Sequence, residues 1–172
     1  MNEMEQIQIH KVTVNIGIGE VGEDVQKAAN LVERLTGSTA VKTQSGDDAK
    51  GFGLRSGLDI GAMTTLRGED AYDLLERLFD AREDNIHINN FDDQGNLSFG
   101  IGEYINIPGI EYDPDIGMMG LEVAVTLERP GFRVKRRKED SREIGQDHRI
   151  TPQEAANYMI DQFGVDIDGV EQ

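Results

Sequence analysis

Several short stretches of the chain alternate apolar and polar residues, a spacing that predicts β-strands with one buried face. In the first stretch, Val12, Val14 and Ile16 alternate with polar neighbours. The apolar Ile9 falls in the opposite phase, so we expect a β-bulge or bend near His10. The expected strands lie at about 7–16, 39–43, 59–67, 97–101 and 119–128.

Three other stretches repeat apolar residues every three or four positions, which is typical of a helix with one buried side. Gly37 and Gly164 follow two of these stretches and are suited to end a helix. Thr151, Pro152 and Glu154 begin the last helix as cap, first residue and capping-box partner. The expected helices lie at about 23–36, at 69–82, and from Pro152 to Gly164.

Strands with one apolar and one polar face, combined with these helices, predict the α+β class. We expect residues 1–172 to form a single domain in which a mainly antiparallel sheet has helices packed on one face. The other face would be open, and RNA is one large ligand that could bind there. Residues 44–57 lack periodicity and are expected to form a long hairpin loop. The open face would carry Lys11, Thr13, Asn15, Thr65 and Arg67.

The charge of the chain is strongly negative but unevenly distributed. The 172 residues include 33 acidic and 17 basic ones, which gives a net charge of −16. Between residues 129 and 149, eight Lys and Arg residues outnumber four acidic ones, so this basic segment carries +4 and the remainder −20. A basic island in an acidic protein indicates a local anionic partner. The alternative is a solvated loop paired with neighbouring acids.

The acidic composition also indicates the conditions in which the protein works. Only six of the 17 basic residues are lysine, and an acid-rich, lysine-poor chain is typical of proteins in concentrated salt. At molar salt the Debye length falls to about 3 Å, so net charge no longer repels nucleic acid and local contacts decide binding. We therefore expect a halophilic protein; the alternative is an ordinary acidic cytosolic one.

The sequence gives little support for catalysis or membrane insertion. The chain has no cysteine, and no apolar run is long enough for a signal peptide or a membrane helix, so a cytoplasmic protein is expected. Residues 17–22 fit GxGxxG, but the next expected strand lacks the acidic residue of a dinucleotide fold. The isolated histidines have no metal-ligand spacing. We expect no enzyme activity, no metal and no cofactor.

A set of short motifs extends over nearly the whole chain. They are Val12–Gly19, Gly53–Gly57, Ile60–Ala62, Thr65–Gly68, Asn96–Ile101, Tyr112–Gly117, Gly120–Val123, Arg129–Val134 and His148–Ile150. Taken in this order, they resemble the archaeal branch of the ribosomal protein L5 family. Each motif alone is weakly specific, whereas the ordered set is highly specific.

The resemblance implies a non-enzymatic component of the large ribosomal subunit, located in the cytoplasm. Members of this family bind 5S ribosomal RNA in the central protuberance, contact 23S ribosomal RNA and bridge to a protein of the small-subunit head. Their long hairpin loop, here 44–57, reaches toward transfer RNA in the peptidyl site. By position, Asn15 and Thr65 match polar residues that the family uses on 5S RNA, and Arg55 matches an arginine of the tRNA-facing loop.

We expect the RNA-binding residues to come from the open face, its neighbouring strand and the basic segment. These are Lys11, Thr13, Asn15, Lys42, Thr65, Arg67, Arg133, Lys135, Arg136, Arg137, Lys138, His148 and Arg149. The loop would add two cations facing tRNA, Lys50 and Arg55.

The loop departs from the family pattern, in which it is rich in lysine and arginine. Here it contains Asp47 and Asp48, whose charges would repel a tRNA backbone. A second interpretation is therefore a diverged paralogue that left the ribosome and acts as a protein-interaction module through its acidic face. An enzyme with a carboxylate or nucleotide site is the third.

Overall fold

The computed structural model describes residues 2–82 and 86–170 and contains a five-stranded antiparallel sheet with the strand order β2-β3-β1-β6-β5. The strands of this sheet are β1 Gln8–Gly17, β2 Val41–Gln44, β3 Asp59–Leu66, β5 Leu97–Ile101 and β6 Leu121–Glu128. A separate pair of short strands is formed by β4 Ile86–His87 and β7 Ile167–Asp168. The α-helices of the described residues are α1 Glu23–Thr36, α2 Glu69–Arg82 and α3 Pro152–Phe163.

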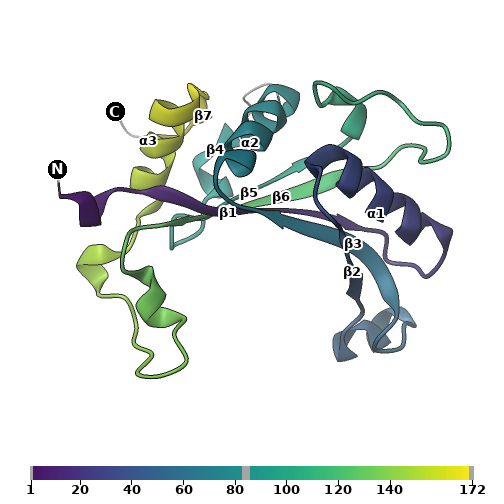
Figure 1. Ribbon diagram of the computed structural model, residues 1–172, viewed down its shortest axis with the longest axis horizontal. Coiled ribbons are helices and arrows are strands. Elements are labelled where there is room, and N and C mark those ends of the chain that lie inside the picture. The colour runs from purple at the N-terminus through teal and green to yellow at the C-terminus, as the bar shows by residue number, and fades with distance from the viewer. Residues whose placement is uncertain (1, 83–85, 171–172) are drawn as a thin grey trace.

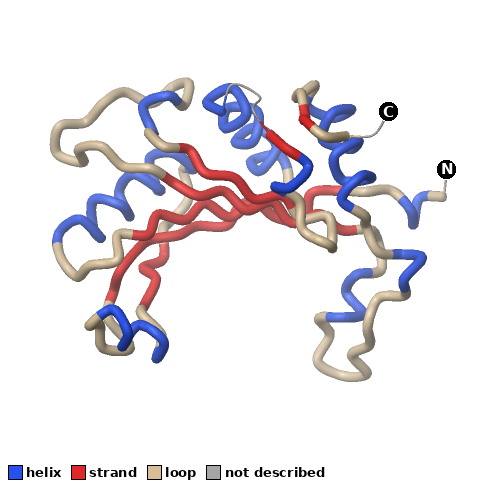
Figure 2. Tube along the Cα trace, turned by 180° about the vertical axis from the view of Figure 1, so that it is seen from behind, coloured by secondary structure: helices blue, strands red, loops and turns tan. Residues whose placement is uncertain are grey.

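Helices α1, α2 and α3 lie on the same side of the sheet (Figure 1). The opposite side, which we call the open face, is the concave side of an arched sheet when the molecule is seen from behind (Figure 2). Two segments extend beyond the sheet on this side, one at each end: the loop between β2 and β3, and the basic segment 129–149 after β6. The predicted α+β class, with a mainly antiparallel sheet and helices on one face, is confirmed.

Strand β1 is the centre of the sheet, because it pairs with β3 on one side and with β6 on the other. Its residues Val12 and Val14 are completely buried, as the alternation predicts. The register with β6 shifts between Ile9 and Lys11, which confirms the expected bulge at His10. The bulge returns Ile9 to the buried side, so both ends of the strand contribute to one core.

The ends of the helices follow from local chemistry, and α1 and α2 have the predicted bounds. Gly37 adopts a left-handed conformation with φ 68° after α1, and its N–H donates to the Glu33 carbonyl over 2.8 Å. At the start of α3, the Thr151 side chain accepts from the Glu154 N–H, and the Glu154 carboxylate accepts from the Thr151 N–H. This capping box confirms the predicted start of the helix.

The sequence pattern misses two short features. Strands β4 and β7 pair in parallel, with Ile86 opposite Ile167, and two residues are too few to show alternation. The predicted loop 44–57 contains a 3₁₀ helix, Asp47–Phe52. Strands β2 and β6 each begin two residues later than expected, at Val41 and Leu121.

Aromatic side chains join α2 and α3 to the sheet. Phe163 of α3 stacks on Tyr72 of α2 with ring centroids 5.9 Å apart, and it meets Phe79 edge-on at 5.2 Å. The hydroxyls of Tyr72 and Tyr158 are 3.0 Å apart and share a hydrogen bond. Phe79 also stacks on Phe99 of β5 at 5.6 Å. Phe79 of α2 therefore contacts both α3 and the sheet.

We predict that Phe79→Ala lowers the free energy of unfolding by about 3–5 kcal/mol, because it removes a buried ring from a packed core. The matched control is Phe52→Ala, since Phe52 is 88% exposed and its loss should change stability by less than about 0.5 kcal/mol. Urea unfolding followed by circular dichroism measures both. Equal effects of the two substitutions would contradict the described core.

Candidate RNA-binding face

Cross-strand pairing gathers polar side chains of three strands in the middle of the open face. Thr13 of β1 lies opposite Thr65 of β3 and Ala124 of β6. The hydroxyl oxygens of Thr13 and Thr65 are 3.3 Å apart and share a hydrogen bond. Asn15 donates from Nδ2 to Glu122 Oε2 over 3.3 Å. These bonds hold Thr13, Thr65 and Asn15, all of them predicted site residues, in a fixed arrangement.

A shallow hollow lies beside Asn15, where small residues line strands β5 and β6. Ser98, Gly100 and Ala124 contribute to its surface. The amide oxygen of Asn15 can accept a hydrogen bond, and the carboxylate of Glu122 only accepts. This part of the face therefore suits hydroxyl and amino donors, such as ribose 2′-hydroxyls, better than it suits phosphate.

The basic segment is joined to the open face through Glu128, the last residue of β6. The Glu128 carboxylate lies 3.0 Å from His10 Nδ1 and 2.6 Å from Arg136 NH1. Burial lowers the pKa of His10, and Glu128 opposes this effect. The positive charges of Arg136, Arg67 and Lys11 lower the same pKa further. We call the cations Lys11, Arg67 and Arg136 around His10 the basic corner, where the bulge of β1 meets the basic segment.

Arg129 belongs to the basic segment by sequence but has a structural role. Its side chain is 9% exposed. It donates to Glu154 Oε1 over 2.7 Å and to the carbonyl oxygen of Arg149 over 3.3 Å. Because Arg129 and Arg149 are the first and last residues of the segment, these bonds join its two ends. Arg129 is therefore not available to neutralise an RNA phosphate.

Most other cations of the basic segment face solvent. Arg133, Arg137, Lys138 and Arg142 are exposed, and within the described residues no carboxylate forms an ion pair with them. Arg137 donates from Nε and NH2 to the Asp140 carbonyl over 2.8 and 2.6 Å, which shapes the turn of the segment. Exposed guanidinium and ammonium groups of this kind can neutralise phosphates.

Two residues of the predicted RNA-binding set, Lys42 and His148, do not lie on the open face. Lys42 is opposite Ala62 in the register, and Ala62 is fully buried on the helix side. The exposed Lys42 therefore lies at the edge of the sheet, on the helix side. The Nε2 atom of His148 is 2.9 Å from the Pro130 carbonyl, and its ring meets Phe132 edge-on at 5.7 Å. His148 thus packs inside the basic segment.

Two family models match consecutive parts of the chain and together cover most of it. A family model described as "Ribosomal protein L5" matches residues 2–55, and a second one, for the C-terminus of the same ribosomal family, matches residues 59–158. The chain belongs to the ribosomal protein L5 family. Three archaeal relatives, each named large ribosomal subunit protein uL5, are similar to it over nearly their whole length. They are from Cenarchaeum symbiosum (42% identity over 96% of this chain and 98% of the relative), Sulfolobus acidocaldarius (45%, 96% and 93%) and Nanoarchaeum equitans (47%, 95% and 97%).

Membership in the L5 family confirms the resemblance seen in the motifs and the prediction of a non-enzymatic protein. No helix among the described residues is long and apolar enough to cross a membrane. The same part of the chain shows no cluster of three or more His, Asp or Glu side chains that could hold a metal ion.

The long L5 loop, residues 44–57, is closed at its base by Ser45. This side chain is buried, and its hydroxyl donates to the Arg55 carbonyl over 2.5 Å. The same hydroxyl accepts from the Leu58 N–H over 3.1 Å. The position of Arg55 in the loop therefore depends on a residue whose role has no signal in the sequence pattern.

The outer part of the loop presents mixed chemistry. Lys50 Nζ lies 3.8 Å from Asp47 Oδ1, and both side chains are largely exposed, so this ion pair contributes little stability. Phe52 is 88% exposed at the end of the 3₁₀ helix. The loop thus offers an exposed aromatic ring beside acidic groups, at the opposite end of the sheet from the basic segment (Figure 1).

The surroundings of His10 give a test of the basic corner. We predict that the pKa of His10 lies below its ordinary value of 6.5, mainly because the ring is partly buried. Glu128→Gln should lower this pKa further by removing the opposing carboxylate, whereas Arg136→Gln should raise it by removing a nearby cation. Titration of the ring by NMR measures all three proteins. Shifts of the opposite sign would contradict this placement of the charges.

Proposed function

We propose that this L5-family chain is a structural component of the large ribosomal subunit in the cytoplasm and binds 5S ribosomal RNA in the central protuberance. The observation that carries the proposal is the basic corner, where cations of the open face and of the basic segment come together. Lys11 and Arg67 extend the face toward Arg136, so polar and cationic groups form one continuous surface. Such a surface suits the backbone of a folded RNA.

The two parts of this surface would have different tasks. Arg133, Arg137 and Lys138 would neutralise phosphates and set the orientation of the RNA. Thr13, Asn15 and the hollow beside them would contact ribose hydroxyls. The open face lies between two flanking segments (Figure 2), so an RNA bound along it could contact the sheet and the basic segment together.

The net charge of −16 is compatible with RNA binding if the protein works in molar salt, as we propose. The Debye length is then about 3 Å, so distant carboxylates on the helix side do not repel RNA. Direct contacts from the basic corner decide the affinity instead.

We predict that Arg136→Glu/Arg137→Glu weakens binding to 5S RNA by at least about tenfold, because two cations on the proposed surface become repulsive. The matched control is Lys27→Glu/Lys42→Glu, which reverses two cations away from the open face. Filter binding in molar potassium chloride measures both. Equal losses in the two variants would contradict the proposed surface, and unchanged binding in both would exclude the basic segment.

Further ribosomal contacts follow from the same proposal. The chain would also touch 23S ribosomal RNA and a protein of the small-subunit head, with the loop 44–57 near tRNA in the peptidyl site. Arg55 and Lys50 are the loop cations that could meet that tRNA. Asp47 and Asp48 oppose a phosphate contact, so the loop would contribute less to tRNA binding than a basic loop does.

The acidic loop with its exposed Phe52 favours a second candidate, an off-ribosome paralogue that binds a protein. Sedimentation separates the two. We predict one copy of the chain per large subunit after washing in molar salt, because a protein that works at that salt concentration must keep its RNA contacts there. A chain recovered only in the soluble fraction would support the paralogue instead.

A further inference from the structure

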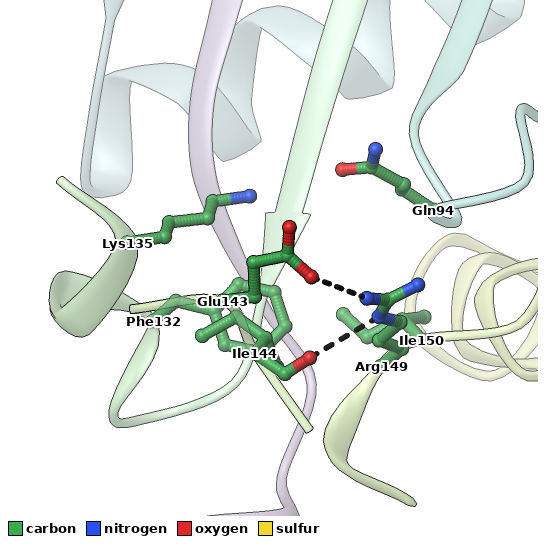
Figure 3. Close-up of a pocket in the computed structure, with 7 residues that line it drawn as sticks. All are labelled: Gln94, Phe132, Lys135, Glu143, Ile144, Arg149 and Ile150. Atoms are coloured by element: carbon green, nitrogen blue, oxygen red, sulfur yellow. Dashed lines mark hydrogen bonds and ion pairs between the residues drawn. The ribbon is translucent and has the colours of Figure 1, made fainter. Parts of the chain in front are cut away.

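A cavity of about 270 Å³, open to solvent, lies between the basic segment and the turn at Gln94. Its floor is apolar: Phe132 and Ile150 are 6% and 1% exposed, and Ile144 completes it. Figure 3 shows polar side chains around this floor, contributed by Gln94, Lys135, Glu143 and Arg149. The cavity therefore combines an aromatic and aliphatic floor with a charged rim.

Contacts within the segment order the rim. Arg149 donates from Nε to the Ile144 carbonyl over 3.2 Å, and its NH2 lies 3.7 Å from Glu143 Oε2. Lys135 Nζ lies 5.2 Å from the centroid of the Phe132 ring. The cations are thus held beside the floor, whereas the Glu143 side chain, which is 95% exposed, can turn toward a ligand.

Gln94 reaches the cavity from a turn that is distant in sequence. The carboxylate of Asp92 accepts from the N–H groups of Gln94 and Asn96 over 2.9 and 2.8 Å, which orders the turn. Gly95 has φ 76° there, and a Cβ on it would come within 2.6 Å of Ile150 Cγ2. The turn therefore packs directly against the floor of the cavity and holds the backbone of Gln94 in place.

We propose that this cavity binds one unstacked RNA base that carries an exocyclic amino group. The inference rests on the proposed RNA-binding function and adds a site to it. A base has an apolar plane that suits the floor and a polar edge that suits the Gln94 amide, which both donates and accepts. Lys135 and Arg149 would attract the phosphates on either side of that nucleotide.

Glu143 decides between a base and a phosphate. A phosphate in the cavity would meet an apolar floor and the repulsion of the Glu143 carboxylate. A carboxylate is only an acceptor, and an exocyclic amino group is a donor that matches it. Adenine, cytosine and guanine have this group and uracil does not, so the cavity should discriminate against uracil.

The test uses purified 5S and 23S ribosomal RNA, the whole chain and molar potassium chloride. Each base is probed with dimethyl sulfate or a carbodiimide, with and without protein. The variants are Glu143→Ala and Gln94→Ala, and the matched control is Glu139→Ala. Glu139 lies in the same segment but outside the cavity, so the control removes the same charge. We expect the wild type and the control to protect one adenine, cytosine or guanine.

In the two cavity variants that base should become reactive, with affinity about tenfold below the control, as expected when hydrogen bonds to the edge of one base are lost. RNA binding with no base whose protection depends on Gln94 and Glu143 would overturn the inference. Protection of a uracil would also overturn it. Failure of the wild type to bind either RNA would remove the proposed function itself.

Discussion

The alternation of side chains along β1 is the constraint on which the rest of the molecule depends. Its buried residues, Val12 and Val14, lie between β3 and β6 beneath the helices. Because a pleated strand sends successive side chains to opposite sides, Thr13 and Asn15 must then face outward. The bulge at His10 shifts this alternation by one residue, which returns Ile9 to the core. One strand therefore provides both the centre of the core and the centre of the proposed RNA-binding surface.

The same geometry explains how an acidic chain can carry a basic surface. Helices cover one side of the sheet, and acidic residues occupy the first turns of α1 and α2 there. The basic corner and the basic segment lie on the other side or at its end. One carboxylate near these cations is used internally, because Glu128 of β6 joins His10 to Arg136. Acidic and basic residues therefore lie on different parts of the molecule, and the net charge of the chain does not describe the charge of the open face.

The sequence predicts the elements whose signals are local. The capping box at Thr151 and Glu154, the glycine after α1 and the alternation in β1 each depend on residues a few positions apart, and all three are found. It does not predict β4 and β7, because each strand has only two residues and their partners lie about 80 positions apart in the chain. Such pairing depends on contacts made in the folded protein and not on local preference.

For the candidate site, the sequence identifies charge but not the partner of each charge. In the sequence, Arg129 and His148 look like Arg133, because all three belong to the basic segment. In the structure, Arg129 is nearly buried against Glu154, and His148 packs on Phe132. The side of the sheet on which Lys42 lies follows only from the register between β2 and β3, which the sequence does not give. Gln94 had no signal, because only the folded turn brings it beside the basic segment.

The bonds of Arg129 to Glu154 and to the Arg149 carbonyl have an evolutionary consequence. They connect the two ends of the basic segment to each other and to the first turn of α3, and Arg136 ties its middle to Glu128 at the end of β6. Substitutions, insertions or deletions between these ends can change how strongly the segment attracts an anion without shifting a strand. The fold can therefore be adapted to cells of different salinity by altering one appended segment while the arch beside it stays the same.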